Sequence, residues 1–467
     1  MLFSSIPFLL YFLPVMFAIY FAMPRKLRNI VLLVSSLLFY AYGEPKYVVL
    51  LIFSSMMDYV ISLIIDRNRG TNKAKYALMC SVVINLLILG FFKYSDFFIG
   101  NVNALFNLSI PMMHISLPLG ISFYTFQTMS YTIDVYRRDA NVQRNPLDFA
   151  AYVALFPQLV AGPIVRYQTI ADQMTGRVHT LEDFAKGATR FAIGLGKKVL
   201  IANTLGQLNA AALSASEQSV LMHWLAIAAF MLQIYFDFSG YSDMAIGLSW
   251  IFGFHILENF NYPFIAKSIT EFWQRWHISM GTWFREYIYI PLGGNRVSKL
   301  KWVRNIAVVW FCTGLWHGAA WNFIAWGMYF GILLTVEKLW LMKLLNKLPA
   351  AVRHIYTLFI VTVSFVIFHL ESMVGIIGHL KGMFGLGGLP AANSEALYYL
   401  GSYKVVLIAA LIGATPLLRN LVLKLKDSAK LQTAVMAANP VFVTALLFAV
   451  TAYLVDSSFN PFLYFRF

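Results

Sequence analysis

Residues 306–338 read IAVVWFCTGLWHGAAWNFIAWGMYFGILLTVEK, an apolar run with a histidine, His317, near its middle. Basic residues lie at both ends of this run: Lys301 and Arg304 precede it, Lys338 ends it, and Lys343 and Lys347 follow it. Because Lys and Arg clusters stay on the cytoplasmic side of a membrane, the run is predicted to cross an even number of times. Its first arm, 306–318, would span only about 20 Å as a helix, less than the ~30 Å hydrocarbon layer. We therefore expect residues 316–321 to form a turn inside the membrane.

The whole chain has the composition of a membrane protein. Its 467 residues are 59% hydrophobic and 12% charged, against about 45–50% and ~25% in soluble domains, and the mean hydropathy is +0.67. The net charge of +15 is explained by cytoplasmic Lys and Arg and by anionic lipid, so nucleic acid is not an expected partner. Cys80 and Cys312 lie in apolar runs and offer neither a disulfide framework nor a zinc-binding spacing. A soluble globular protein is excluded.

Apolar windows long enough to cross a bilayer recur along the chain. They cover residues 5–23, 29–43, 47–65, 77–96, 117–136, 355–372, 404–420 and 438–456. Basic clusters on alternate links place the N-terminus outside, and no basic region precedes the first window, so a retained span is expected in place of a signal peptide. The basic patch 419–430 is expected inside and the tail 459–467 outside.

Two regions do not read as simple crossings. The run 149–165 is apolar, but Pro157 and Gly162-Pro163 interrupt it. Broken backbone at membrane depth needs protein or a water-lined cavity around it, so a re-entrant or shallow element is expected there. Between 187 and 254, polar residues are too frequent for crossings to be placed.

The segment 265–305 combines basic and aromatic residues. It holds seven Lys and Arg and two acids, together with Trp273, Trp276, Trp283, Tyr287 and Tyr289. This mixture is typical of a membrane interface, here the cytoplasmic one. An aromatic belt with charges beside the lipid headgroups would also explain it.

Two histidines are the candidates for chemistry. An ionisable group at the depth expected for His317 is costly and usually functional, and a neutral imidazole can take a proton from a hydroxyl. Gly318, Ala319 and Ala320 are expected to leave room for another backbone or a substrate, with Trp316 and Trp321 beside that space. His277 lies in the basic-aromatic segment and could equally be an interfacial histidine bonded to backbone.

Acidic residues that could assist are few. Asp237 and Asp243 occupy the otherwise apolar stretch 235–243, YFDFSGYSD, and must be paired or hydrated. Bracing of the helix bundle is the favoured interpretation, while orientation of a histidine and cation binding stay open.

Several common motifs are missing from the sequence. It contains no phosphate-binding GxxxxGK[ST] loop, no HExxH, no CxxC and no GxSxG elbow. A transporter or flippase would also suit a buried histidine and broken helices, although no internal repeat is visible. A scaffold for a secreted transferase is a third hypothesis, and it predicts that both histidines are dispensable.

Several stretches together resemble the membrane-bound O-acyltransferase family, in its alginate O-acetyltransferase-like bacterial branch. FWQRWHIS (272–279), continuing through TWFREY (282–287) to IPLGG (290–294), is similar to the first histidine motif, and WHGAAWNF (316–323) to the second. Further matches are PLGISF (118–123), FPQLVAGPI (156–164), the stretch 237–243 and the ending NPFLYFRF (460–467).

The resemblance implies an all-α polytopic fold. The expected architecture is a ring of about 11 transmembrane helices, with re-entrant and interfacial helices, around a central tunnel. The chain 1–467 would be one integral-membrane domain, with N-terminal spans in 1–140, a catalytic core in 141–345 and C-terminal spans in 346–467.

The resemblance also implies a reaction and its residues. His317 would be the general base for an acceptor hydroxyl, and His277 would position the thioester or stabilise the oxyanion. The expected donor-binding residues are Arg275, Trp276, Arg285, Trp316, Asn322, Asp237 and Asp243. No metal is expected in the site.

The substrates and partners follow from the same resemblance. The donor would be acetyl-CoA or an acylated phosphopantetheine carrier arriving from the cytoplasm, and the product an O-acetylated exported polysaccharide such as alginate, cellulose or peptidoglycan. D-alanyl transfer toward teichoic acid is the alternative. A periplasmic or extracellular partner transferase is expected, and the location is the bacterial inner membrane.

Overall fold

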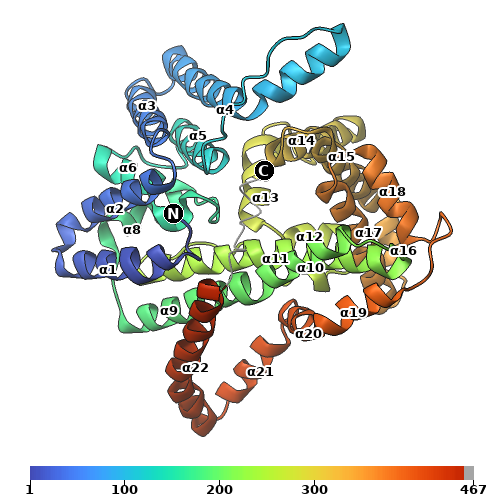
Figure 1. Cartoon of the computed structure of the whole chain (residues 1–467). Helices are drawn as coiled ribbons and strands as arrows, with labels where there is room; N and C mark the ends of the chain where they lie inside the picture. The colour runs from blue at the N-terminus through green and yellow to red at the C-terminus, as the bar shows by residue number, and fades with distance from the viewer. Residues whose placement is uncertain (457–467) are drawn as a thin grey trace. The chain divides into compact units, whose positions relative to one another are not determined.

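The computed structural model describes residues 1–456, and this part of the chain contains helices and irregular segments but no strand. It divides into two compact units. The first contains residues 1–191 and 244–257, and the second contains residues 192–243 and the described chain from 258 onward. Figure 1 labels the helices. The predicted all-α fold class is confirmed.

The first unit contains the N-terminal helices. They are η1 (Phe8–Phe12), α1 (Leu13–Ala22), η2 (Arg25–Leu27), α2 (Arg28–Gly43), α3 (Val48–Arg67), α4 (Asn72–Phe106), α5 (Ile121–Arg137), α6 (Pro146–Ala154), α7 (Phe156–Leu159) and α8 (Tyr167–Gly176). Helices α9 (Leu181–Gly196) and α11 (Val220–Ile251) contribute residues to both units.

The second unit contains both candidate histidines. Before and around them lie η3 (Lys197–Ala202), α10 (Asn203–Leu213), η4 (Pro263–Ile265), α12 (Ile269–Arg275), α13 (Ile278–Phe284), η5 (Arg285–Tyr289), α14 (Lys299–His317), α15 (Trp321–Val336), η6 (Glu337–Leu341) and α16 (Met342–Leu345). After them come α17 (Ala350–His369), α18 (Met373–Met383), α19 (Ser394–Ser402), α20 (Lys404–Gly413), α21 (Leu417–Lys426) and α22 (Ala429–Asp456).

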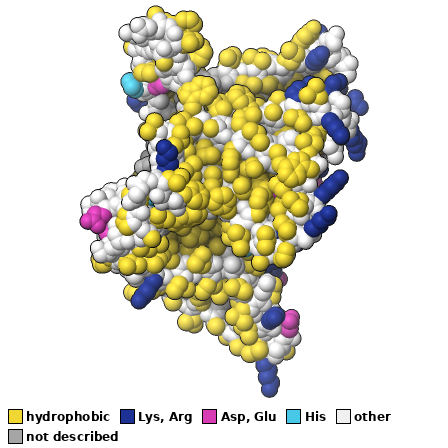
Figure 2. Space-filling view, turned by 90° about the vertical axis from the view of Figure 1, so that its right-hand side faces the viewer, with side chains coloured by type: hydrophobic (Ala, Val, Ile, Leu, Met, Phe, Trp, Pro, Cys, Tyr) yellow, Lys and Arg dark blue, Asp and Glu magenta, His cyan; other side chains and the backbone are white. Residues whose placement is uncertain are grey.

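The surface and the helix lengths are those of a multi-pass membrane protein. Among the described residues, five helices are long and apolar enough to cross a bilayer: α3, α4, α11, α17 and α22. The pair α19 and α20 is a sixth candidate if its 60° bend lies within one span. Figure 2 shows hydrophobic side chains over most of the visible face, and exposed residues such as Leu105, Val405 and Phe448 fit contact with lipid.

The predicted N-terminal windows agree with helices, apart from differences at their ends. Window 77–96 is the middle of the 35-residue α4, and window 117–136 becomes α5, which starts only at Ile121. Gly120 has a φ of +72° there, so the helix cannot begin earlier. The interrupted run 149–165 forms the two short helices α6 and α7 and no long helix.

Two expectations nearer the C-terminus need correction. Window 404–420 is not one helix, because α20 ends at Gly413 and α21 begins at Leu417, directly after Pro416. Window 438–456 is the second part of α22, which starts at Ala429 and contains Pro440. The region 187–254, where no crossing was placed, contains the 32-residue α11. The expected outer tail, 459–467, lies outside the described residues.

The arm before His317 is longer than predicted. Helix α14 begins at Lys299, seven residues before the apolar run. Its first turns therefore contain Lys299, Lys301 and Arg304. Its 19 residues correspond to about 28 Å, so the half-length arm was wrong. The turn itself is confirmed, since α14 ends at His317 and α15 starts at Trp321.

Small residues bring α14 and α15 into direct backbone contact, and Figure 1 shows these two helices beside each other. A Cβ atom on Gly327 would lie 2.3 Å from the Trp310 carbonyl oxygen and 3.1 Å from Gly314 Cα. A Cβ on Gly314 would lie 2.5 Å from the Phe323 carbonyl oxygen. Membrane helices commonly use glycine in this way, because association there depends on close packing. This contact fixes the two arms on either side of the His317 turn.

Gly327→Ala is expected to destabilise the protein by about 1–3 kcal/mol, because the added methyl must push the two helices apart. The measurement is thermal unfolding in detergent, monitored by tryptophan fluorescence. Gly378→Ala in α18 is the matched control, since its Cβ would meet no heavy atom within 4 Å. Equal unfolding temperatures for the two variants would contradict the close contact.

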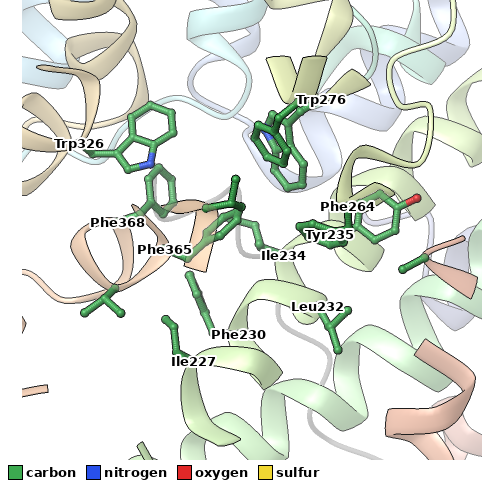
Figure 3. Close-up of a cluster of buried hydrophobic side chains, with 14 of the residues drawn as sticks. Ile227, Phe230, Leu232, Ile234, Tyr235, Phe264, Trp276, Trp326, Phe365 and Phe368 are labelled. Atoms are coloured by element: carbon green, nitrogen blue, oxygen red, sulfur yellow. The ribbon is translucent and has the colours of Figure 1, made fainter. Parts of the chain in front are cut away.

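A buried aromatic cluster forms the core of the second unit. Figure 3 shows part of it, with Trp276, Trp326, Phe365 and Phe368 labelled. These side chains come from the segment after α12, from α15 and from α17. The core therefore joins the elements that surround the two histidines.

Candidate functional site

His317 ends α14 and is 3% exposed. Its ring makes edge contacts with Trp326, at 4.9 Å between centroids, and with Phe368, at 5.4 Å. Trp316 lies 5.0 Å away on the same turn. Three aromatic side chains thus hold the imidazole, and two of them come from other helices.

Two details of the predicted turn are different in the structure. A Cβ on Gly318 would lie 2.2 Å from the ring of Phe323, so the space beside this glycine is filled by Phe323 and offers no room for a substrate. Trp321 is 60% exposed and does not line the site as expected. Trp316 is 4% exposed and lines the site as expected.

His277 has an unusual backbone conformation. It lies between α12 and α13 with φ at +46°, a left-handed conformation that costs a non-glycine residue roughly 1–2 kcal/mol. Its carbonyl accepts from the Gly281 N–H at 3.1 Å, and the Ile278 N–H donates to the Asn259 carbonyl at 3.0 Å. These two hydrogen bonds keep His277 in the strained backbone conformation, and such strain is common at functional sites.

The His277 side chain is completely buried. Its Nδ1 lies 3.2 Å from Asn259 Oδ1, and its ring contacts Phe238 at 4.7 Å edge-on and Phe260 at 6.5 Å stacked. Burial lowers the pKa of His277 to about 3. The imidazole is therefore neutral at physiological pH.

Trp316 brings the two histidines together. Its ring centroid lies 5.7 Å from that of His277 and 5.0 Å from that of His317. The first and second histidine motifs, 40 residues apart in sequence, therefore meet at one buried aromatic side chain.

Glu337 anchors the helix that leads to His277. This carboxylate is 0% exposed and accepts from the backbone N–H groups of Ile269, at 2.7 Å, and Thr270, at 2.9 Å. Tyr356 donates to it at 3.3 Å. A carboxylate at the start of a helix satisfies N–H groups that have no partner within the helix. Glu337 follows α15 and so connects the helix after His317 to the helix before His277.

The other residues predicted from the first motif have different surroundings. Arg275 donates to Glu271 at 3.0 Å and to the Asn261 carbonyl at 3.0 Å, so it closes the end of α12. Trp276 stacks on Phe272 and is 5% exposed, within the core. Arg285 begins η5 and is exposed, as a donor-binding cation would be.

Asn322 connects two helices. It is 1% exposed, and its amide nitrogen donates to the carbonyls of Ile367, at 3.4 Å, and Phe368, at 3.2 Å. These carbonyls belong to the last turn of α17, where the helix itself provides no donor. Asn322 therefore joins the start of α15 to the end of α17.

Asp237 and Asp243 are paired with two adjacent lysines. Lys198 lies 2.7 Å from Asp237, with both side chains 3% exposed, and Lys197 lies 2.7 Å from Asp243. The lysines begin the π-helix η3. The Lys198–Asp237 pair is thus buried and the Lys197–Asp243 pair is partly buried. Each of the four charges has an opposite charge beside it, which supports the bracing interpretation.

Gly240 allows these ion pairs to form. A Cβ added to Gly240 would lie 2.7 Å from the Gly194 carbonyl oxygen and 3.2 Å from the backbone nitrogen of Lys198, so α11 passes very close to η3. Phe238, one residue after Asp237, contacts the His277 ring. The ion pairs therefore fix the part of α11 that forms one side of the His277 site.

Sequence reasoning missed four residues of this site: Asn259, Glu337, Lys197 and Lys198. Lys197-Lys198 and Glu337 are charges beside or within apolar stretches, a signal that could have identified them. Asn259 gives no such signal, because it lies in an ordinary loop 18 residues before His277.

The arrangement defines a class of protein: a polytopic helical membrane protein with two buried histidines joined by a tryptophan. Residues 137–376 match the membrane-bound O-acyltransferase family. A probable alginate O-acetylase of Azotobacter vinelandii is 38% identical over the full length of both chains. The chain belongs to the membrane-bound O-acyltransferase family and is an O-acyltransferase.

Two further relatives differ in their named substrates. A peptidoglycan O-acetyltransferase of Helicobacter pylori is 35% identical over 83% of this chain and 81% of its own. A teichoic acid D-alanyltransferase of Bacillus subtilis is 33% identical, but over 46% of this chain and 58% of its own. The transporter and scaffold hypotheses are set aside by the family assignment.

Proposed function

We propose that the enzyme transfers an acetyl group from a cytoplasmic thioester, across the bacterial inner membrane, to a hydroxyl of an exported polysaccharide. The observation that carries this proposal is the contact of His277 and His317 with the same Trp316 ring. Full-length similarity to a probable alginate O-acetylase supports acetyl transfer and an alginate-like acceptor.

The reaction makes one ester and breaks one thioester. The acceptor oxygen attacks the thioester carbonyl, its proton goes to His317, and the leaving thiolate takes up that proton to become a thiol. His277 lies beside the thioester and positions it. The acetyl group passes from sulfur to oxygen without any redox step.

The donor is acetyl-CoA or an acylated phosphopantetheine carrier. Six cationic side chains in 265–305 are exposed, which suits recognition of phosphates at the cytoplasmic face: Lys267, Arg285, Arg296, Lys299, Lys301 and Arg304. Charge-assisted hydrogen bonds from such groups are about twice as strong as neutral ones. With this segment on the cytoplasmic side, the proposed topology keeps the N-terminus outside, as the basic clusters between the N-terminal windows predict.

The acceptor arrives from the opposite side. It is a hydroxyl of the polysaccharide itself or of a periplasmic or extracellular partner transferase that completes the transfer. Teichoic acid D-alanylation is the alternative, and the shorter match to that relative makes it the weaker one.

The purified enzyme with radiolabelled acetyl-CoA tests the proposal. Base-labile label is expected on an added oligosaccharide of alginate. A parallel reaction receives a D-alanyl carrier protein with a teichoic acid acceptor. Transfer in the second reaction alone would overturn acetyl transfer in favour of D-alanyl transfer.

Reversing Arg285, Arg296 and Lys299 to Glu is expected to raise the KM for acetyl-CoA by tenfold or more, because each lost contact with a phosphate removes about 1.5–3 kcal/mol. The KM for the acceptor should stay the same. The matched control reverses three exposed cations of α21, Arg419, Lys424 and Lys426. An unchanged KM, or an equal rise in the control, would refute donor binding at 265–305.

A further inference from the structure

Asn259 lies in a loop, and its side chain makes several contacts with the first histidine motif. It is completely buried. Its side-chain oxygen accepts from the Ser279 N–H at 3.1 Å and from the Ser279 hydroxyl at 2.9 Å, and it lies 3.2 Å from His277 Nδ1. One amide oxygen therefore holds both the backbone after His277 and the imidazole.

These contacts fix which way the Asn259 amide points. A backbone N–H can only donate, so the atom that faces Ser279 N must be the oxygen. An amide oxygen has no hydrogen to give. His277 Nδ1, which faces the same oxygen, must therefore be the donor of their hydrogen bond.

We propose that Asn259 is a positioning residue that fixes His277 as the Nδ1-protonated tautomer, so that its Nε2 accepts a hydrogen bond from the substrate. The inference rests on the proposed role of His277 beside the thioester. A neutral imidazole has a single N–H, and here that N–H donates its hydrogen bond to Asn259. His277 therefore cannot stabilise an oxyanion by donating from Nε2, as the sequence had led us to expect.

The surroundings keep His277 in this neutral form. The rings of Phe238, Phe260 and Trp316 contact the imidazole, and an apolar environment disfavours the charged state. Nε2 then suits a substrate group that donates, either an amide N–H of the pantetheine arm or the acceptor hydroxyl. The first source predicts that His277→Ala raises the KM of the donor, and the second predicts a rise for the acceptor.

The direct test is nitrogen NMR of the purified enzyme with ¹⁵N-labelled histidine, in which His277→Gln identifies the His277 signals. We expect a protonated Nδ1 and an unprotonated Nε2 in the wild-type protein at neutral pH. The opposite tautomer would overturn the proposal. This measurement needs no substrate, so it can fail while acetyl transfer stands, and acetyl transfer can fail while the tautomer stands.

Variants of Asn259 test the same point through the reaction. Asn259→Ala is expected to mix the two tautomers and to lower kcat/KM by about 10–100-fold, the usual range for a residue that orients a histidine. Asn259→Asp places a carboxylate beside Nδ1–H and raises the pKa of His277. The rate should then fall as the pH decreases toward 6, because protonated His277 accepts nothing.

Asn209→Ala is the matched control, since Asn209 is also buried in this unit but donates only to the Ala226 carbonyl, at 2.9 Å, among the contacts described. It should leave the His277 signals and the pH profile unchanged. Asn259→Ala with wild-type tautomer and rate, or the same changes in Asn209→Ala, would overturn the proposal.

Discussion

His317→Ala is expected to reach the membrane in normal amount and to transfer acetyl groups about 10²–10⁴-fold more slowly, the usual contribution of a general base. The substitution removes the imidazole that lies among Trp316, Trp326 and Phe368. The measurement is acetate bound to the polymer in cells, together with kcat of the purified enzyme. The KM for acetyl-CoA should change little, because His317 acts on the acceptor hydroxyl.

His379→Ala is the control for the loss of any buried histidine. His379 is 8% exposed in α18, where it bonds to His223 at 3.1 Å. Neither His379 nor His223 is among the side chains described above around His277 and His317. Its specific activity should match that of the wild type. Full acetylation by an abundant His317→Ala protein would refute the assignment of the general base.

Asp237→Leu is expected to destabilise the enzyme by about 3–5 kcal/mol, because Lys198 would be left as an uncompensated buried charge. The double variant Lys198→Met, Asp237→Leu should regain most of this loss, since apolar replacements of a buried pair are often neutral or stabilising. The measurements are abundance in the membrane and thermal unfolding in detergent. The exposed pair Lys186–Glu182 provides the control, as Lys186→Met should cost at most about 1 kcal/mol.

The double variant also separates bracing from substrate binding. If the ion pair only fixes α11 beside His277, the stable double variant should keep transferring acetyl groups. A stable double variant without activity would contradict bracing and would return Asp237 to the donor-binding residues. A single variant as stable as the wild type would contradict the pairing itself.

The fold was predictable as far as hydrophobic pattern determines it. The apolar windows predicted most of the long helices. The turn at 316–321 was predicted from the flanking charges together with a short first arm, and the structure has the turn but not the short arm. The length of α14 was not predictable from hydropathy, because a helix can continue through lysines and arginines once its end leaves the hydrocarbon layer. The break between α20 and α21 at Pro416 shows the opposite case, in which backbone chemistry ends a helix inside an apolar window.

The site was predictable where a motif marked it and unpredictable where tertiary contacts made it. His277 and His317 were identified from their motifs, and the structure joins them through Trp316. The depth argument for His317 relied on a half-length arm, which the 19-residue α14 does not support. Asn259 and Glu337 hold the His277 segment from distant positions, and no spacing rule links them to it. Gly318 was interpreted as open space, whereas the ring of Phe323 occupies that position.

The most direct test of the central claim uses proteoliposomes with the purified enzyme. Radiolabelled acetyl-CoA is added outside, and an alginate oligosaccharide is enclosed within the vesicles or, in a parallel preparation, added outside with the acetyl-CoA. We predict labelled ester on the enclosed oligosaccharide for the wild-type enzyme and none above background for His317→Ala. Label only on oligosaccharide present on the same side as acetyl-CoA, or equal transfer by His317→Ala, would contradict the account.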